Sequence, residues 1–223
     1  MQKIAQQKLS IIFWIVAAAD ICSILFTWPW PHYIFKALLI PALIMLWRTS
    51  DGYGGKYILL IGLIFSWLGD VLLMLEPQHK LFFIFGLAAF LTTHIFYIVF
   101  FLKKRTGRSL LAKQPWWLIL VPAYGVGLVW FLYPKLGDLR IPVIAYATVI
   151  CTMLLCSIHV FGKINRRAGW LYCFGAIFFV VSDSLLALNK FYQPYPYAGP
   201  LIMVTYCLAQ FLIVRGFLAE EAK

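Results

Sequence analysis

Long runs of hydrophobic residues, separated by short polar connections, follow one another along the whole chain. A helix needs about 20 apolar residues to cross the roughly 30 Å hydrocarbon core of a bilayer. Residues 28–35 either extend the short second run or lie at the membrane interface. The pattern predicts eight membrane-spanning helices, with seven as the alternative, and the eight runs lie at about residues 9–26, 33–47, 57–75, 81–102, 116–133, 141–161, 168–188 and 197–218.

Composition agrees with a lipid-embedded chain. Hydrophobic residues make up 63% of the 223 residues and charged residues 12%, with a mean hydropathy of +0.87, whereas soluble domains are roughly 45–50% apolar. The first run follows Lys3 and Lys8 but lacks a small-residue cleavage site, so we expect it to stay in the fold. No soluble domain interrupts the runs. The fold class is therefore an all-α integral membrane protein, with residues 1–223 as a single polytopic domain.

The net charge of +11 is distributed unevenly between the two predicted sides of the membrane. If the N-terminus is cytoplasmic, the cytoplasmic connections hold all of the 19 lysines and arginines except Lys36, Lys80, Lys135, Arg140 and Lys190. This positive-inside bias places both termini in the cytoplasm. The basic residues lie in short loops rather than on one soluble face, so they indicate contact with anionic membrane lipid and not with nucleic acid.

Cysteine and histidine show no pattern of a disulfide framework or metal site. All five cysteines fall within predicted spans, which is typical of small core residues. The four histidines are expected at different depths, and neither an HExxH nor a CxxC spacing occurs. We therefore expect neither a metal nor another cofactor.

Three of the eight acidic residues, Asp20, Asp70 and Asp183, lie inside predicted spans. An aspartate near the middle of a membrane helix costs around 2.5–3.5 kcal/mol on insertion scales and usually faces a partner or a cavity. For Asp20 the simplest role is a buried ion pair with Lys36. Asp70 and Asp183 either fix helix packing through a Tyr, Ser or Lys partner, or share a polar pocket in which one carboxyl group acts as an acid.

The third and seventh runs resemble one another and suggest a parallel repeat of four plus four spans. Gly62, Ser66 and Asp70 lie on one stripe of the third run, and Gly175 and Asp183 recur at matching positions in the seventh. Small residues on such a stripe allow membrane helices to approach closely. Both aspartates should lie in the outer half of the bilayer, where the side chains expected at similar depth are Lys36, His94, Tyr97, Tyr146, Tyr206 and Gln210.

Five segments carry a resemblance to a known family. They are FKALLIPALIMLW (35–47), LIFSWLGDVLLML (63–75), FGLAAFLTTHIFYIVFF (85–101), GAIFFVVSDSLLALNKF (175–191) and TYCLAQFLIVRG (205–216). In these segments the chain resembles the YhhN-type lysoplasmalogenase family of small polytopic membrane proteins. The resemblance implies hydrolysis of the vinyl ether bond of a lysoplasmalogen, a lysophospholipid, to a fatty aldehyde and glycerophosphoethanolamine or glycerophosphocholine.

The residue chemistry fits such a reaction. Protonation of the β-carbon of an enol ether gives an oxocarbenium ion, to which water adds before the hemiacetal collapses. One of Asp70 and Asp183 would be the general acid, and the other would stabilise the cation and activate water. Lys36 would meet the phosphate, and the other substrate-binding candidates are His94, Tyr97, Tyr146, Tyr206 and Gln210.

Other functions are also consistent with parts of the pattern. A proton-coupled or lipid transporter would use the repeated aspartates as protonation sites, although their depth in the outer half disfavours it. A Ser66–His94–Asp70 nucleophile lacks a GxSxG elbow, and a non-catalytic scaffold would not need two acids in lipid. The sequence leaves the oligomeric state open. The expected location is the cytoplasmic or plasma membrane in a bacterium and the endoplasmic reticulum in a eukaryote.

Overall fold

The computed structural model describes residues 2–50, 55–104, 109–161 and 163–221. Its described residues form helices and connections, with no strand among them. Eight helices are long and apolar enough to cross a membrane, which confirms the predicted number. Arg105, Arg108 and Lys223, which the positive-inside bias assigns to the cytoplasmic side, lie outside the described residues.

The helices follow the predicted hydrophobic runs closely. Helices satisfy their own backbone hydrogen bonds, so a long apolar run in lipid adopts this conformation. The helical elements are α1 (Gln2–Leu25), α2 (Pro29–Arg48), α3 (Lys56–Met74), α4 (Leu81–Leu102), α5 (Leu110–Lys113), α6 (Trp117–Leu132), η1 (Tyr133–Lys135), η2 (Gly137–Leu139), α7 (Arg140–Val160), α8 (Arg166–Ala187), η3 (Leu188–Tyr192) and α9 (Ala198–Glu221).

Four features differ from the hydrophobic pattern. Helix α1 starts at Gln2, several residues before the hydrophobic run that begins at about residue 9. The second helix starts at Pro29, so residues 28–35 extend it, and a proline in the first turn suits a helix start because its nitrogen needs no helical acceptor. The long polar connection contains the short helix α5, whose Ser109 accepts a hydrogen bond from the backbone of Leu111. Beyond Ala187, helix α8 continues as the π-helical turn η3.

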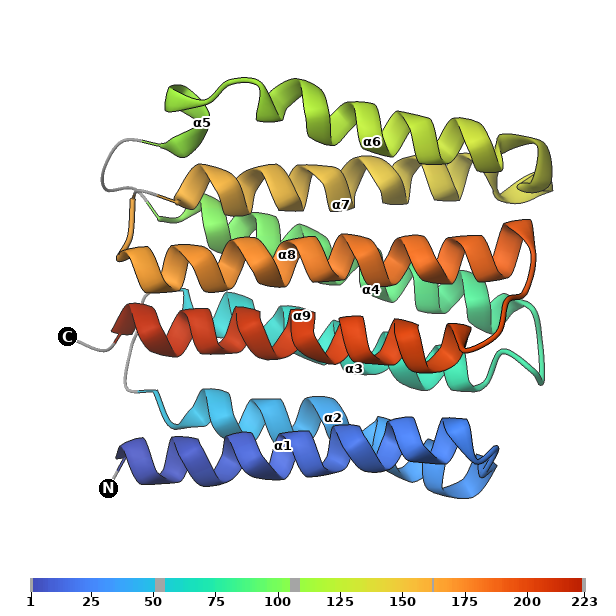
Figure 1. Cartoon of the computed structure of the whole chain (residues 1–223), viewed down its shortest axis with the longest axis horizontal. Helices are drawn as coiled ribbons and strands as arrows, with labels where there is room; N and C mark the ends of the chain where they lie inside the picture. Colours follow the sequence, from blue (N-terminus) through green and yellow to red (C-terminus); the bar gives the residue numbers. More distant parts are fainter. Residues whose placement is uncertain (1, 51–54, 105–108, 162, 222–223) are drawn as a thin grey trace. The chain divides into compact units, whose positions relative to one another are not determined.

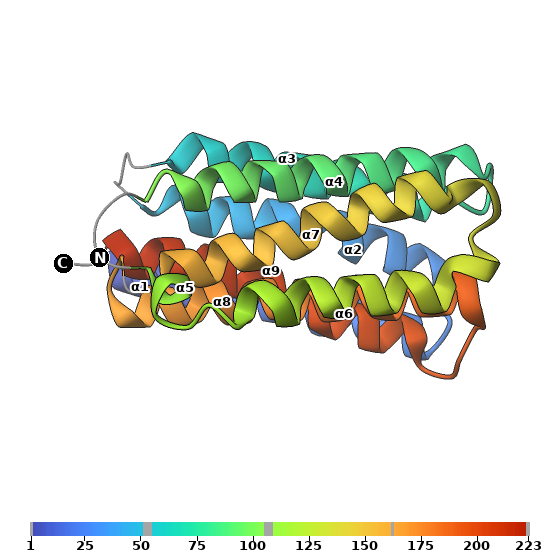
Figure 2. The ribbon, with the colours of Figure 1, turned by 90° about the horizontal axis from the view of Figure 1, so that it is seen from above.

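The chain divides into two compact units, one made mainly of residues up to Tyr97 and the other of Ile98–Glu220. In the first unit, α1 packs on α2 and α2 on α3, and α3 runs beside α4 (Figures 1 and 2). The indole Nε1 of Trp67 in α3 donates a hydrogen bond to the Ala37 carbonyl in α2 at 2.9 Å. A Cβ atom added at Gly62 of α3 would lie 2.5 Å from Cε1 of Tyr97 in α4, so glycine permits this close helix contact.

In the second unit, α6, α7, α8 and α9 follow one another as neighbouring helices (Figure 1). Gly175 of α8 lies against α9, where an added Cβ would be 3.1 Å from the Ala209 carbonyl oxygen and 2.8 Å from Cγ1 of Ile213. Gly62 and Gly175 occupy matching positions in the suggested repeat, and each contacts the helix that follows its own. The duplication itself stays a prediction.

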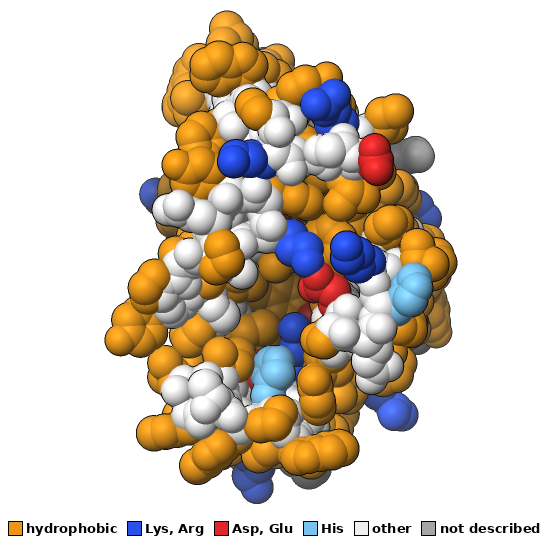
Figure 3. Space-filling model, turned by 90° about the vertical axis from the view of Figure 1, so that its right-hand side faces the viewer, with side chains coloured by type: hydrophobic (Ala, Val, Ile, Leu, Met, Phe, Trp, Pro, Cys, Tyr) orange, Lys and Arg blue, Asp and Glu red, His pale blue; other side chains and the backbone are white. Residues whose placement is uncertain are grey.

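Large apolar side chains remain uncovered by protein on many helices, as lipid contact requires. They include Trp130 and Ile141, which are 78% and 80% exposed. Figure 3 shows the helix ends at the right-hand side of Figure 1, where Lys, Arg, Asp, Glu and His side chains lie among hydrophobic ones. Four cysteines are buried as expected, but Cys22 is exposed.

Candidate functional site

Asp183 of the second unit is held by a tyrosine from the neighbouring helix. The Tyr146 hydroxyl, on α7, donates a hydrogen bond to Oδ2 of Asp183, on α8, at 2.5 Å. Both side chains are partly buried. The structure therefore brings together two residues that the sequence placed at similar depth. A carboxylate that accepts such a short bond has one oxygen fixed in orientation.

A second polar contact, which the sequence analysis missed, lies one residue further along α8. The Tyr124 hydroxyl, on α6, donates to Oγ of Ser184 at 2.8 Å, and Ser184 donates to the Val180 carbonyl at 2.6 Å. In the sequence, the only signal for Tyr124 and Ser184 was that they are polar residues within apolar runs. Depth alone did not indicate which helix would supply the partner of Ser184.

These contacts line a small chamber between α6, α7 and α8, which we define by Tyr124, Tyr146, Asp183 and Ser184. The chamber has a volume of about 60 Å³, enough for a few water molecules at roughly 10–15 Å³ each. It adjoins a larger apolar groove of about 510 Å³ between α6 and α7. A carboxylate, two hydroxyl donors and space for water thus lie beside a surface suited to hydrocarbon.

The first unit buries the other aspartate. Asp70 on α3 is 2% exposed, and His94 and Tyr97 on α4 are fully buried, as expected for interior residues. The Thr93 hydroxyl, also on α4, donates to the Gly62 carbonyl of α3 at 3.1 Å. The α3–α4 pair therefore collects buried polar groups around its close glycine contact.

Lys36 lies on α2 at a depth close to that of Asp70. The Trp67 bond to Ala37 fixes the level of α2 against α3. Asp70 comes three residues after Trp67 in α3, which is roughly 4.5 Å along the helix. Lys36 is partly buried, so its stem packs on protein.

The expected ion pair between Asp20 and Lys36 is wrong. Asp20 is fully buried, and its Oδ1 lies 2.8 Å from Nδ1 of His32. Of the two positions that the sequence allowed for residues 28–35, the structure has the helical one: α2 begins at Pro29 and carries His32 in its first turns, against α1. In the described part of the chain, Oδ2 of Asp20 has no hydrogen-bond partner.

Replacing His32 with alanine should destabilise the first unit. The change leaves the buried Asp20 carboxyl group without its partner, which should lower the free energy of unfolding by about 1–3 kcal/mol. Thermal unfolding in detergent measures the effect. His79→Ala, outside the long helices, is the control, and an equal response of both variants would contradict a structural role for the pair.

Tyr206 and Gln210 form a buried pair on α9. Nε2 of Gln210 donates to the Tyr206 hydroxyl at 3.4 Å, and the two side chains are 1% and 4% exposed. The Tyr206 ring meets Phe179 of α8 edge to face, with centroids 5.7 Å apart. Tyr206 and Gln210 share one face of α9, as their spacing predicted.

These features define a class of protein: a polytopic membrane protein whose spanning helices carry buried carboxyl groups beside apolar surface. Among the described residues, no group of three or more His, Cys, Asp or Glu side chains is placed to hold a metal ion. Ionisable residues at membrane depth commonly mark proton chemistry or a substrate path.

A profile of the YhhN family matches residues 31–217, and the chain belongs to this family. It is 35% identical to lysoplasmalogenase TMEM86B of Sus scrofa over 190 residues, which is 82% of this chain and 74% of the relative. It is 36% identical to lysoplasmalogenase TMEM86A of Homo sapiens over 69% of this chain and 62% of the relative. The uncharacterized membrane protein YhhN of Escherichia coli O157:H7 is 26% identical to this chain, over 84% of this chain and 87% of the relative. No solved structure gives a significant match.

Proposed function

We propose that this protein is a lysoplasmalogenase, which hydrolyses the vinyl ether bond of a lysoplasmalogen in the membrane. The observation that carries the proposal is the Asp183 carboxyl group, held by Tyr146 in a small chamber beside an apolar groove. The names of the mammalian relatives support it. They also favour a hydrolase over the proton-coupled or lipid transporter.

The proposed reaction adds one water molecule across the enol ether. A carboxylic acid gives its proton to the β-carbon, and the α-carbon and ether oxygen share the resulting positive charge. Water adds to the α-carbon and loses a proton to the second carboxylate. The hemiacetal then breaks its bond to the glycerol oxygen, giving a fatty aldehyde and a glycerophosphodiester with its hydroxyl restored.

Asp70 and Asp183 are the two carboxyl groups proposed for these steps. Each belongs to a different compact unit. Tyr146 would orient the Asp183 carboxyl group through its hydrogen bond. The assignment of acid and base between the two aspartates stays open to experiment.

The remaining candidates would position the substrate. Lys36 is the candidate of the first unit for the phosphate contact, because a partly buried ammonium group near the level of Asp70 suits a headgroup held at the outer surface. The buried His94 and Tyr97 on α4, and the Tyr206–Gln210 pair on α9, would orient water or the glycerol hydroxyl.

The direct test is aldehyde release by the purified protein. We expect a fatty aldehyde from 1-alkenyl lysophosphatidylethanolamine or lysophosphatidylcholine, and none from the matching 1-alkyl lysophospholipid, which lacks the double bond. Aldehyde is measured by coupled reduction. Folded protein that releases no aldehyde from either alkenyl lipid would overturn the proposal.

The Tyr146→Phe variant should reduce kcat by about tenfold. The change removes the hydroxyl that holds Asp183 and keeps the aromatic ring. The Asp183 carboxyl group would then no longer be held in one orientation, which lowers kcat. Steady-state aldehyde release measures it. Tyr172→Phe is a matched control, because Tyr172 donates to a different carboxylate, Glu220, at 2.9 Å. Equal loss in both variants would contradict a specific role for Tyr146.

A further inference from the structure

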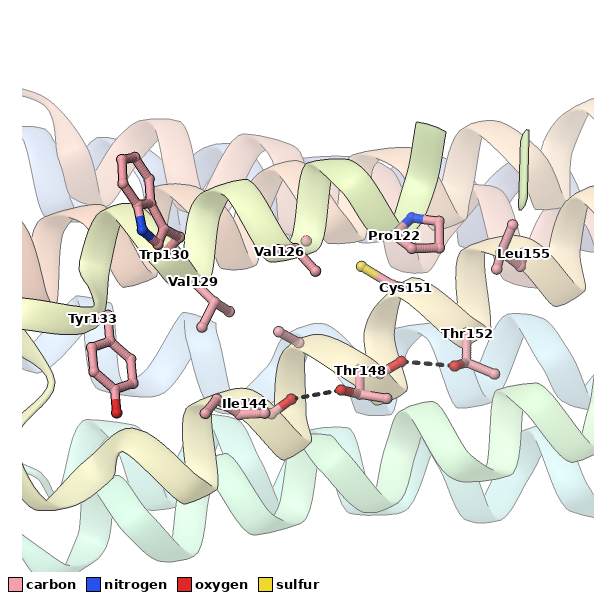
Figure 4. Close-up of a pocket in the computed structure, with 12 residues that line it drawn as sticks. Pro122, Val126, Val129, Trp130, Tyr133, Ile144, Thr148, Cys151, Thr152 and Leu155 are labelled. Atoms are coloured by element: carbon pink, nitrogen blue, oxygen red, sulfur yellow. Dashed lines mark hydrogen bonds between the residues drawn. The ribbon is translucent and has the colours of Figure 1, made fainter. Parts of the chain in front are cut away.

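The apolar groove lies between α6 and α7, with lining side chains from both helices (Figure 4). Two of its lining residues on α6, Trp130 and Val126, are 78% and 69% exposed. The hydroxyls of Thr148 and Thr152 donate to carbonyls of their own helix at 2.8 and 2.7 Å. Their hydrogen-bonding capacity is used within α7, so the groove presents a hydrocarbon-like surface.

The dimensions of the groove suit one lipid chain. Its lining on α7 extends from Ile144 to Leu155, which is roughly 16 Å along the helix. One leaflet of the hydrocarbon core is about 15 Å deep. The volume of about 510 Å³ lies within the roughly 300–1,000 Å³ of small-molecule sites.

The groove adjoins the Asp183 chamber. The two share the lining residues Gly125, Val129, Ala147 and Cys151. A Cβ atom at position 125 would lie 2.7 Å from Sγ of Cys151. Gly125 and Cys151 are therefore in close contact where the groove meets the chamber, and a larger side chain at position 125 would displace Cys151 there.

The chamber is closed toward the α6–α7 connection. Leu132, Leu136 and Val143 form a buried apolar cluster there, with Ala187 packed against it. Leu132, Val143 and Ala187 also line the chamber. A substrate therefore meets packed side chains from that end but an open groove from the side of the bilayer.

A positive charge lies at the end of the groove near this connection. The Arg140 guanidinium carbon is 4.6 Å from the centre of the Tyr133 ring, and Tyr133 lines the groove. Arg140 precedes Tyr146 by six residues in α7, roughly 9 Å along the helix. If an anionic headgroup binds at Arg140, the part of the lipid next to the headgroup lies at the same depth as the chamber.

We infer that the α6–α7 groove binds the single hydrocarbon chain of an ether lysophospholipid, with the Gly125–Cys151 contact as its boundary with the Asp183 chamber and Arg140 as its phosphate contact. The inference rests on the proposed lysoplasmalogenase function and adds the route of the substrate, which arrives sideways from the bilayer. Arg140 lies in the same unit as Asp183, whereas Lys36 lies in the other.

The first experiment compares Gly125→Leu with Gly127→Leu on the same helix. A Cβ atom at Gly127 meets nothing within 4 Å, so this control adds the same side chain on the open face. We expect Gly125→Leu to lower kcat/KM at least tenfold for a long-chain alkenyl lysolipid and to affect a two-carbon vinyl ether of glycerophosphate little. Equal activity of both variants on the long chain would overturn the inference.

Arg140→Gln tests the phosphate contact. We expect KM to rise about fivefold for the alkenyl lysophospholipid and to stay constant for the uncharged 1-alkenylglycerol. Lys36→Gln is assayed alongside. A rise in KM for Lys36→Gln alone would move the phosphate contact to the first unit and contradict this part of the inference.

A binding measurement separates this inference from the proposed activity. The probe is a 1-alkyl lysophosphatidylethanolamine with a photoreactive chain, which cannot be hydrolysed as an enol ether. Cross-links in the α6 and α7 peptides that line the groove, reduced in Gly125→Leu but retained in Gly127→Leu, would support the inference even if no aldehyde forms. Cross-links confined to other helices would overturn it even in an active enzyme.

Discussion

Replacing either Asp70 or Asp183 with asparagine should reduce kcat for aldehyde release by a hundredfold or more. General acid–base catalysis typically contributes about 10²–10⁴-fold, and asparagine keeps the shape of the side chain but neither gives nor takes the proton. The loss should appear in kcat, because the groove that we assign to the lipid chain is unchanged. Steady-state assays with a long-chain alkenyl lysolipid measure the effect.

Asp138→Asn is the matched control for this pair. Asp138 is an exposed carboxylate in η2, so its loss should leave kcat unchanged. Each variant should elute as folded protein in detergent with a thermal midpoint near that of the wild type. Full activity in both Asp70→Asn and Asp183→Asn would exclude carboxylate catalysis. The double variant should lose no more than the worse single variant if the two groups act on one reaction.

The Gly175→Val variant should destabilise the packing of α8 against α9. A Cβ atom at this position would lie 2.8 Å from Cγ1 of Ile213 and 3.1 Å from backbone atoms of α9. Backbone atoms cannot move without shifting the helix, so α8 and α9 must separate. Overpacking of this kind costs about 1–3 kcal/mol, which we expect as a lower thermal midpoint in detergent.

Gly127→Val controls for the change of glycine to a β-branched residue within a helix, because its side chain would meet no neighbour. Gly62→Val tests the same contact in the first unit. There the added Cβ meets the Tyr97 ring rather than backbone, so the effect should be smaller. A thermal midpoint for Gly175→Val equal to that of Gly127→Val would show that α8 and α9 do not need this close contact.

The sequence predicted the spans well because lipid leaves few alternatives. A long apolar run must satisfy its backbone hydrogen bonds internally, and helix length follows from bilayer thickness. The helix starts of α1 and α2 lie before the hydrophobic runs, and at α2 two prolines and two tryptophans interrupt the hydrophobic pattern. Because α2 starts at Pro29, His32 lies against α1, where it pairs with Asp20 in place of the expected Lys36.

The sequence indicated candidate residues because ionisable side chains are rare within its apolar runs. A carboxylate in an apolar run is costly, so Asp70 and Asp183 were conspicuous, and Tyr146 followed from depth. Tyr124 and Ser184 were missed, because depth gives the level of a side chain but not its rotation about the helix axis. Whether two residues at one level meet depends on how the two helices pack.

The sequence alone determined that this is an all-helical membrane protein with eight spans and buried acids, because hydrophobic run length and the cost of charge in lipid act locally. The tertiary structure decided that Tyr146 and not another tyrosine holds Asp183, that His32 pairs with Asp20, and that Gly125 lies where an apolar groove meets a polar chamber. Each of these contacts depends on the relative rotation of neighbouring helices, which is fixed by side-chain packing across their interface and is not encoded in either helix separately.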